Sequence, residues 1–580
     1  MTSASMEMSA SARSKASAAT DALDAALASL KDKAREFARL SPSQRAALLR
    51  ACIPRTVAAA EAWTRAACEA KGLDFEGPSS SEEWLAGPMA TVRNLRLLAE
   101  SLEAIGRTGS PGPAPERFGR TPLGQSVVQV FPNTLVESLL YGGFSAEVRF
   151  LDGVSPEDAQ RKQASFYKKS APDGGVSLVL GAGNVASIPP MDAIYKMFVD
   201  GNVCIVKLNP VNEYLAPFYE DAFAPLVEKG YLRFVMGGAE VGSHLTYHPL
   251  VDDVHITGSD RTHDLIVWGP PGPERERRQA ENKPLLDKPI SSELGCVTPV
   301  VIIPGPYSES ELDFMAANVA TMMANNASCN CNAGKMLVTS KHWPAREGFL
   351  ARVRAILATV KPRKAYYPGA FDRYEKLVGN RAKAEKLGDA GEGQLPWTLV
   401  FGLDAADKEE SLFTTEPFCP ILSEVALEEH SGAEFIKAAT TFCNERLWGT
   451  LSAVVFIHPR TAGDPTCADA FEHMLRDLRY GAVGVNQWSA LAYALVTTPW
   501  GAHPSSTLAN VQGGLGWVHN TFLLEAIEKV VVRGPLTVFP KPPWFVTHKN
   551  AHEVARRMVA LEAEPSVLKV PGVALAALKG

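Results

Sequence analysis

The spacing of apolar and polar positions first predicts a helical segment over about residues 22–106. The SPSQ stretch at residues 41–44 is typical of a helix start with proline in its first turn, and Gly72 is typical of a helix end. Pro54 lies between them and predicts a kink or a division of that helix. A proline- and glycine-rich loop is expected at residues 108–117.

After about residue 171 short apolar runs alternate with helical segments. All-apolar runs of this length are typical of strands buried on both faces of a parallel sheet. Helices are expected near Met191–Val199 and Tyr214–Lys229. The alternation predicts an α/β fold with a doubly wound parallel sheet. The four expected strands are Val176–Leu180, Val203–Leu208, Arg233–Met236 and Asp252–Ser259.

A second α/β region is expected after a charged, proline-rich stretch at residues 270–289, which predicts a long surface loop. The alternation resumes at residue 290, with a helix over Glu309–Asn325. The predicted organisation has four parts: a disordered Ser/Ala/Met-rich segment (1–20), a first domain with N-terminal helices (21–289), a second domain (290–490), and a segment that returns to the first domain and ends in a C-terminal extension (491–580).

Composition and charge argue against several classes of protein. The net charge is −6 and no long basic run is present, so nucleic acid is not expected as a partner. The sequence has no apolar stretch long enough for a membrane span and no secretory signal pattern. Nine cysteines without paired CxxC spacing are typical of reduced thiols. These features favour a cytoplasmic protein without membrane contact.

Polar and glycine-rich motifs follow the expected strands. GAGN, KLNP, GGAEVG and TGSD come where strands should end, and α/β sheets bind ligands at the carboxyl ends of their strands. A glycine-rich turn that opens a helix offers free N–H groups to phosphate, although each motif alone also suits a tight turn. Together they favour a dinucleotide site. Lys207 either binds a ligand or extends to solvent, and Glu293 is either a general base or an ion-paired carboxylate.

The stretch NNASCNCNAGK, residues 325–335, holds two cysteines one residue apart. A structural zinc site needs four ligands, and no second Cys/His pair of suitable spacing lies nearby. A disulfide across one residue would be strained. Small polar neighbours leave room and N–H donors, which lower a thiol pKa and stabilise an oxyanion. The pattern therefore favours a nucleophile over a metal clip or a disulfide.

The order of these motifs resembles the aldehyde dehydrogenase superfamily over about residues 41–540. The resemblance implies three catalytic residues. The register after Asn326 makes Cys331 the nucleophile and leaves Cys329 at a variable position. SELGCVTP gives Glu293 as general base, and GAGNVASIPP gives Asn184 as an oxyanion donor.

The same resemblance implies a cleft for NAD or NADP. Its expected members are Lys207 at the adenosine ribose, Gly238 and Gly242 near the pyrophosphate, Thr257, Gly258 and Ser259 in the cleft, Glu416 at the nicotinamide ribose, and Phe418 against the nicotinamide. The choice between NAD and NADP stays open, because the first acid after Lys207 is Glu213, six positions on.

Several positions depart from the family pattern and indicate a divergent member. Ala327-Ser328 replaces the usual Gly-Gln, Cys296 and Cys419 replace glycines, and Lys335 replaces an arginine. The substrate therefore cannot be carried over from the family. The aromatic residues Trp448, Phe418 and Trp488 suggest an apolar aldehyde tunnel, although such residues are often plain core.

The resemblance implies oxidation of an aldehyde to a carboxylic acid through a thiohemiacetal and a thioester on Cys331. Reduction of an acyl-CoA, or a CoA-acylating reaction, is the first alternative, and a catalytically silent scaffold is the second. A homodimer or homotetramer joined by a β-flap is also implied. Its strands, expected near residues 125–151 and 524–539, would be unpaired edges in a monomer.

Overall fold

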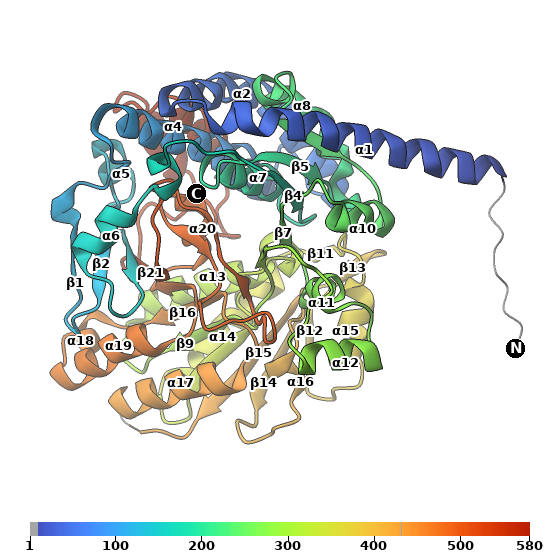
Figure 1. Ribbon diagram of the computed structural model, residues 1–580. Helices are drawn as coiled ribbons and strands as arrows, with labels where there is room; N and C mark the ends of the chain where they lie inside the picture. The colour runs from blue at the N-terminus through green and yellow to red at the C-terminus, as the bar shows by residue number, and fades with distance from the viewer. Residues whose placement is uncertain (1–9, 431) are drawn as a thin grey trace, which may run out of the picture.

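The computed structural model describes residues 10–430 and 432–580, which form two lobes, each built on one large sheet (Figure 1). The first sheet has six strands in the order β19-β8-β7-β4-β5-β6, all parallel except β19. Its strands are β4 (Val176–Leu180), β5 (Val203–Lys207), β6 (Leu232–Val235), β7 (Asp253–Thr257), β8 (Ile290–Glu293) and β19 (Gly514–Leu515). The strands expected from apolar runs in this region are confirmed to within two residues at each end.

Helices cover both faces of this sheet. They are α1 (Ala10–Ala38), α2 (Pro42–Lys71), α3 (Ser81–Trp84), α4 (Ala90–Thr108), α7 (Ile188–Phe198), α8 (Ala216–Ala222), α9 (Ala224–Val227), α10 (Ala239–Tyr247), α11 (Asp260–Trp268) and α12 (Pro273–Ala280), with a π-helical turn at Leu85–Met89. The side chain of Ser41 accepts a hydrogen bond from the Gln44 N–H, which caps the start of α2. Gly72 ends α2 in a left-handed conformation, but Pro54 does not divide the helix.

The second sheet has eleven strands in the order β1-β2-β3-β21-β17-β16-β9-β10-β15-β14-β12. The strands are β1 (Phe118–Arg120), β2 (Ser126–Phe131), β3 (Ser145–Phe150), β9 (Pro299–Ile302), β10 (Met336–Ser340), β12 (Glu385–Leu387), β14 (Trp397–Leu403), β15 (Ile421–Leu427), β16 (Ser452–Phe456), β17 (Ala482–Val485) and β21 (Ile527–Arg533). Its helices include α13 (Glu309–Ala324), α14 (Arg346–Thr359), α15 (Ala370–Val378), α16 (Ser411–Thr414), α17 (Gly432–Arg446), α19 (Pro465–Asp477) and α20 (Ala490–Leu495).

The flap strands are paired inside this chain. β21 runs parallel to β17 and antiparallel to β3, and β3 in turn pairs with β2. The expectation that these strands would be unpaired edges in a monomer was therefore wrong. Two valine-rich strands that need partners obtain them from the eleven-stranded sheet of their own chain.

Four other expectations need correction. The boundary between the domains does not lie at residue 289, because β8 still belongs to the first sheet, and the chain returns to the second sheet between Glu293 and Pro299. The surface loop expected at residues 270–289 contains α12, and the helix expected at Tyr214–Lys229 is divided into α8 and α9. The segment expected to be disordered is helical from Ala10, and residues 1–9 lie outside the described part.

Two further helices end the chain, α21 (Ala551–Ala563) and α22 (Val570–Ala577). Val554, Met558 and Val559 of α21 pack into a core with Trp84 and Met89. The C-terminal segment is thus an integral wall of the first lobe. In the described part of the chain no helix combines the length and the apolar character that a bilayer crossing requires.

Candidate active site

The two lobes bring one thiol and one carboxylate together. Cys331 lies in the turn between α13 and β10, and Glu293 is the last residue of β8 in the other sheet. The Cys331 Sγ donates a hydrogen bond to Glu293 Oε1 at 3.0 Å. The thiol and the carboxylate that the motifs single out are therefore in contact, with one supplied by each lobe.

Burial controls the protonation of this pair. Glu293 is buried, and the loss of solvation, followed by the negative charge of Asp192, raises its pKa to about 7. Burial and then the charge of Glu293 raise the pKa of the Cys331 thiol well above its ordinary value. The thiol therefore keeps its proton at rest, and the carboxylate beside it is placed to accept that proton near neutral pH.

Cys329 is in a different environment. Burial raises its pKa to about 12, and its Sγ is directed toward the backbone carbonyls of Ala327 and Phe418. Within the described residues it makes no contact with a carboxylate like that between Cys331 and Glu293. The two cysteines therefore differ in their hydrogen-bond partners, and Cys331 stays the predicted nucleophile.

The turn that carries Cys331 is held in a rare backbone conformation. Asn326, Ala327 and Ser328 have positive φ angles of 52°, 53° and 62°. Such residues persist only when their surroundings fix them, and they are concentrated at functional sites. The amide of Asn326 donates to the carbonyls of Asn184 and Cys329, while the Asn184 Nδ2 donates to Cys329 O at 3.0 Å. Asn184 is thereby fixed beside the nucleophile turn.

Lys71 and Tyr366 also hold this turn, and neither was expected from the sequence. The Lys71 Nζ donates to Glu83 Oε1 at 2.7 Å, to Asn184 O at 2.9 Å and to Asn326 Oδ1 at 3.0 Å. The Tyr366 hydroxyl is within hydrogen-bond distance of Asn184 O and Asn326 Oδ1. The only sequence signal for Lys71 was its position as the last residue of a helix, which is a common place for a cation.

Two cavities meet at Cys331. The first has a volume of about 140 Å³, and its walls include Leu85, Met89, Trp488 and Tyr493. The second, of about 410 Å³, lies where β4, β7 and β8 end. A thiol shared by the two cavities can react with a molecule in one while a second molecule occupies the other.

The second cavity contains most of the residues expected around a dinucleotide. Lining it are Asn184, Thr257, Gly258, Ser259, Glu293, Glu416 and Phe418. The side chain of Ser259 caps α11, and the hydroxyl of Thr257 donates to Asp192 at 2.8 Å. Lys207, Gly238 and Gly242 lie farther along the same sheet edge, at the end of β5 and at the start of α10, and they do not line this cavity.

Lys335 and Glu416 form a buried ion pair in this cleft. Lys335 Nζ also donates to the carbonyls of Cys296, Asn330 and Cys331, so it anchors the nucleophile turn. The Cys296 N–H donates to the same oxygen of Glu416, Oε1, that Lys335 binds. A Cβ on Gly295 would lie 1.7 Å from Glu416 Oε2, so a larger residue there would displace the Glu416 carboxylate.

The three aromatic residues expected in one tunnel line different cavities. Trp488 lines the smaller cavity and donates from Nε1 to Asn332 O at 2.7 Å. Phe418 and Trp448 line the larger cavity. Spacing in the sequence could not separate them, because all three lie near Cys331 and only the side-chain directions differ.

Known structures share this fold. The aldehyde dehydrogenase KauB of Pseudomonas aeruginosa is 18% identical, with 88% of this chain and 89% of that chain covered at a TM-score of 0.57. An NADP-dependent glyceraldehyde-3-phosphate dehydrogenase of Bacillus halodurans C-125, complexed with NADP, is 16% identical, with 89% of this chain and 91% of that chain covered at a TM-score of 0.57. Identities this low support a common fold only.

A sequence match to a curated protein covers a smaller part of the chain than the structural matches do. The 4-trimethylaminobutyraldehyde dehydrogenase A of Danio rerio is 27% identical over 223 residues, which are 36% of this chain and 39% of that protein. The alignment thus spans about two fifths of that curated relative. The family model described as the aldehyde dehydrogenase family matches residues 144–521, a range that contains Asn184, Glu293 and Cys331. The chain therefore belongs to the aldehyde dehydrogenase family.

Proposed function

We propose that this protein oxidises an aldehyde to a carboxylic acid with NAD or NADP. The observation that carries the proposal is the 3.0 Å contact between the Cys331 thiol and the Glu293 carboxylate, located where two cavities meet. A nucleophile beside its own base, open to a substrate cavity on one side and a cofactor cleft on the other, suits covalent oxidation of a carbonyl group.

In the first half of the reaction Glu293 accepts the thiol proton and Cys331 Sγ attacks the aldehyde carbon. The carbonyl oxygen becomes an oxyanion, which needs donors fixed in advance. Asn184 uses one amide hydrogen on Cys329 O and keeps the second for this oxygen. The Cys331 backbone N–H is the second proposed donor. Loss of hydride from the former aldehyde carbon leaves a thioester on Cys331.

The residues of the larger cavity suit a dinucleotide. The strand ends supply Gly258 and Ser259 at the start of α11, and a helix start attracts phosphate. Oε1 of Glu416 is bound to Lys335. Its other carboxylate oxygen, Oε2, faces Gly295 and can accept a hydrogen bond from a ribose hydroxyl. NAD or NADP bound there would accept the hydride. Lys207, Gly238 and Gly242 are the proposed contacts for the distal half.

In the second half Glu293 first releases the thiol proton to solvent and then accepts a proton from the water that attacks the thioester. The departing Cys331 thiolate regains a proton from Glu293. A carboxylate with a pKa near 7 is ionised often enough to take a proton and basic enough to hold it. This placement favours release of an acid over transfer of the acyl group to a thiol such as coenzyme A. The products are the carboxylic acid, the reduced cofactor and one proton.

The test is formation of reduced nicotinamide, followed by absorbance, with purified protein, neutral aldehydes and NAD or NADP. We expect turnover in the wild type, none in Cys331→Ala, and retained turnover in Cys329→Ala, the matched control two residues away. Loss of turnover in Cys329→Ala alone would contradict the assignment of the nucleophile. Turnover that requires coenzyme A would contradict hydrolysis by Glu293.

A further inference from the structure

One wall of the smaller cavity is built by parts of the chain outside residues 144–521, which match the family model. Leu85, Met89 and Arg93 come from the N-terminal helices, and Trp544 and Met558 come from the C-terminal segment. The common core of the family therefore supplies the reactive end of the cavity at Cys331. Segments outside the matched residues supply the rest of its lining.

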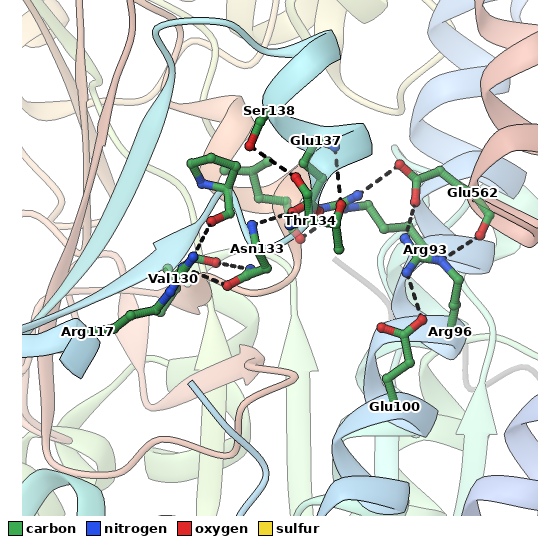
Figure 2. Close-up of polar contacts among 12 residues, drawn as sticks. Arg93, Arg96, Glu100, Arg117, Val130, Asn133, Thr134, Glu137, Ser138 and Glu562 are labelled. Carbon is green, nitrogen blue, oxygen red and sulfur yellow. Dashed lines mark hydrogen bonds and ion pairs between the residues drawn. The ribbon is translucent and has the colours of Figure 1, made fainter. Parts of the chain in front are cut away.

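The C-terminal segment is fastened to that wall by a buried charge cluster (Figure 2). Glu562 of α21 accepts from Arg93 at 2.8 Å and from Arg96 at 2.6 Å, and both arginines belong to α4. Arg96 Nε also donates to the backbone carbonyl of Glu562, and Arg93 binds Glu137 of α5 (Leu135–Leu140) at 2.5 Å. A buried carboxylate that bridges two arginines through charge-assisted hydrogen bonds fixes a helix in position.

The cavity offers a substrate no free charge. Four charged side chains line it within the described chain, and each is paired with an opposite charge. The pairs are Lys71 with Glu83, Glu82 with Arg363, and Arg93 with Glu137 and Glu562. A charged group on a substrate would have to lose its water without gaining a counter-ion.

The volume of the cavity limits the size of the substrate group that can enter it. It measures about 140 Å³, and apolar protein cavities of about 150 Å³ accommodate benzene. A phenyl ring, or an aliphatic chain of about six carbons, is therefore the size of group that such a cavity accommodates. Because Met558 is one of the lining residues, the limit depends in part on a residue of the C-terminal helix α21.

We infer that the C-terminal segment makes this chain selective for uncharged aldehydes with an apolar group of about the size of benzene, and that Met558 sets the upper size limit. The inference rests on the proposed function, since it assigns the smaller cavity to the aldehyde. It gives α21 a role in specificity in addition to its role in packing.

The test compares Met558→Ala with Val554→Ala. Both residues are buried in the same helix, but Val554 does not line the cavity. Straight-chain aldehydes from propanal to decanal, together with phenylacetaldehyde, are supplied with the preferred cofactor. One methylene in a tight pocket changes kcat/KM about tenfold or more. We expect wild type and Val554→Ala to prefer six carbons or fewer, and Met558→Ala to raise the ratio of octanal to butanal at least tenfold.

Aldehydes that carry a carboxylate or a trimethylammonium group at the far end form a second series. We expect kcat/KM at least a hundredfold below that for hexanal. Equal rates for charged and neutral aldehydes, or an unchanged size preference in Met558→Ala, would overturn the inference while leaving the proposed function in place.

A binding measurement separates failure of the proposed function from failure of the size limit. In Cys331→Ala, which has no nucleophile, toluene binding is followed by calorimetry, with naphthalene as the larger probe. We expect toluene to bind, and naphthalene to bind only when Met558→Ala is added. If the wild type oxidises no aldehyde and these binding results still hold, the proposed function fails and the size limit stands. Equal binding of naphthalene with and without Met558→Ala overturns the size limit.

Discussion

Replacing Glu293 with glutamine should stabilise the protein, and the gain should depend on pH. Burial raises the pKa of Glu293 from 4.5 to about 7, so the folded protein holds this proton more tightly than the unfolded chain does. Below pH 4.5 both states are protonated and the shift costs nothing. Between pH 4.5 and 7 the unfolded chain ionises first, so folding stability falls as pH rises.

The size of this cost follows from the two pKa values. The difference between 4.5 and about 7, at about 1.4 kcal/mol for each pH unit, amounts to about 3 kcal/mol above pH 7. Glutamine has no charge to bury, and its carbonyl oxygen can still accept from the Cys331 thiol. We therefore expect Glu293→Gln to add about 3 kcal/mol to the free energy of unfolding at pH 8 and almost nothing at pH 4.5.

Urea unfolding at half-unit steps between pH 4.5 and 8 measures the effect, with Glu392→Gln as the control because Glu392 is exposed. The control should give the same difference from wild type at every pH. If the gain of Glu293→Gln is also constant with pH, Glu293 does not titrate near neutrality in the folded protein. The account of the base given above would then be wrong.

Three further outcomes are expected. Asp192→Asn should move the acid limb of the pH profile of kcat/KM to lower pH, because the negative charge of Asp192 raises the pKa of Glu293. If the acid limb does not move, the charge of Asp192 does not affect the pKa of Glu293. Lys71→Met should lower the free energy of unfolding by about 3–5 kcal/mol, because it leaves the buried Glu83 without its partner, and adding Glu83→Gln should restore most of the loss in urea unfolding. Dilution to nanomolar concentration should leave the circular dichroism and activity unchanged, because β21 completes the sheet of its own chain, and a loss of either on dilution would indicate that the flap needs a second copy.

The strands and the contact between Cys331 and Glu293 could be predicted from the sequence, each for a physical reason. β4 is a buried strand and therefore an apolar run, and its predicted bounds match the structure. Cys331, Glu293 and Asn184 lie in short motifs, and the order of these motifs along the chain carries the prediction. The distances between the three residues in space cannot be obtained from the sequence. Asn184 and Glu293 meet because parallel strands present their carboxyl ends at one edge, whereas Cys331 reaches them from a turn of the other lobe.

The contacts that support the site could not be predicted. Lys71 reaches Asn184 and Asn326, which lie 113 and 255 residues away, and no local pattern encodes such a contact. The pairing of β21 with β17 depends equally on the placement of whole strands. The boundary after Glu293 was placed a few residues early, because a strand that ends one sheet looks like a strand that starts the next.

Glu293 belongs to one sheet, and Cys331 stands in a turn of the lobe built on the other. The distance between these two side chains therefore depends on how the two lobes are placed relative to each other. A shift of one lobe by an ångström or two would separate base from thiol without changing any residue near them, and proton transfer would stop. The placement of the lobes therefore controls the contact between thiol and carboxylate, and we expect a ligand that separates the lobes to inhibit the protein without contacting the thiol.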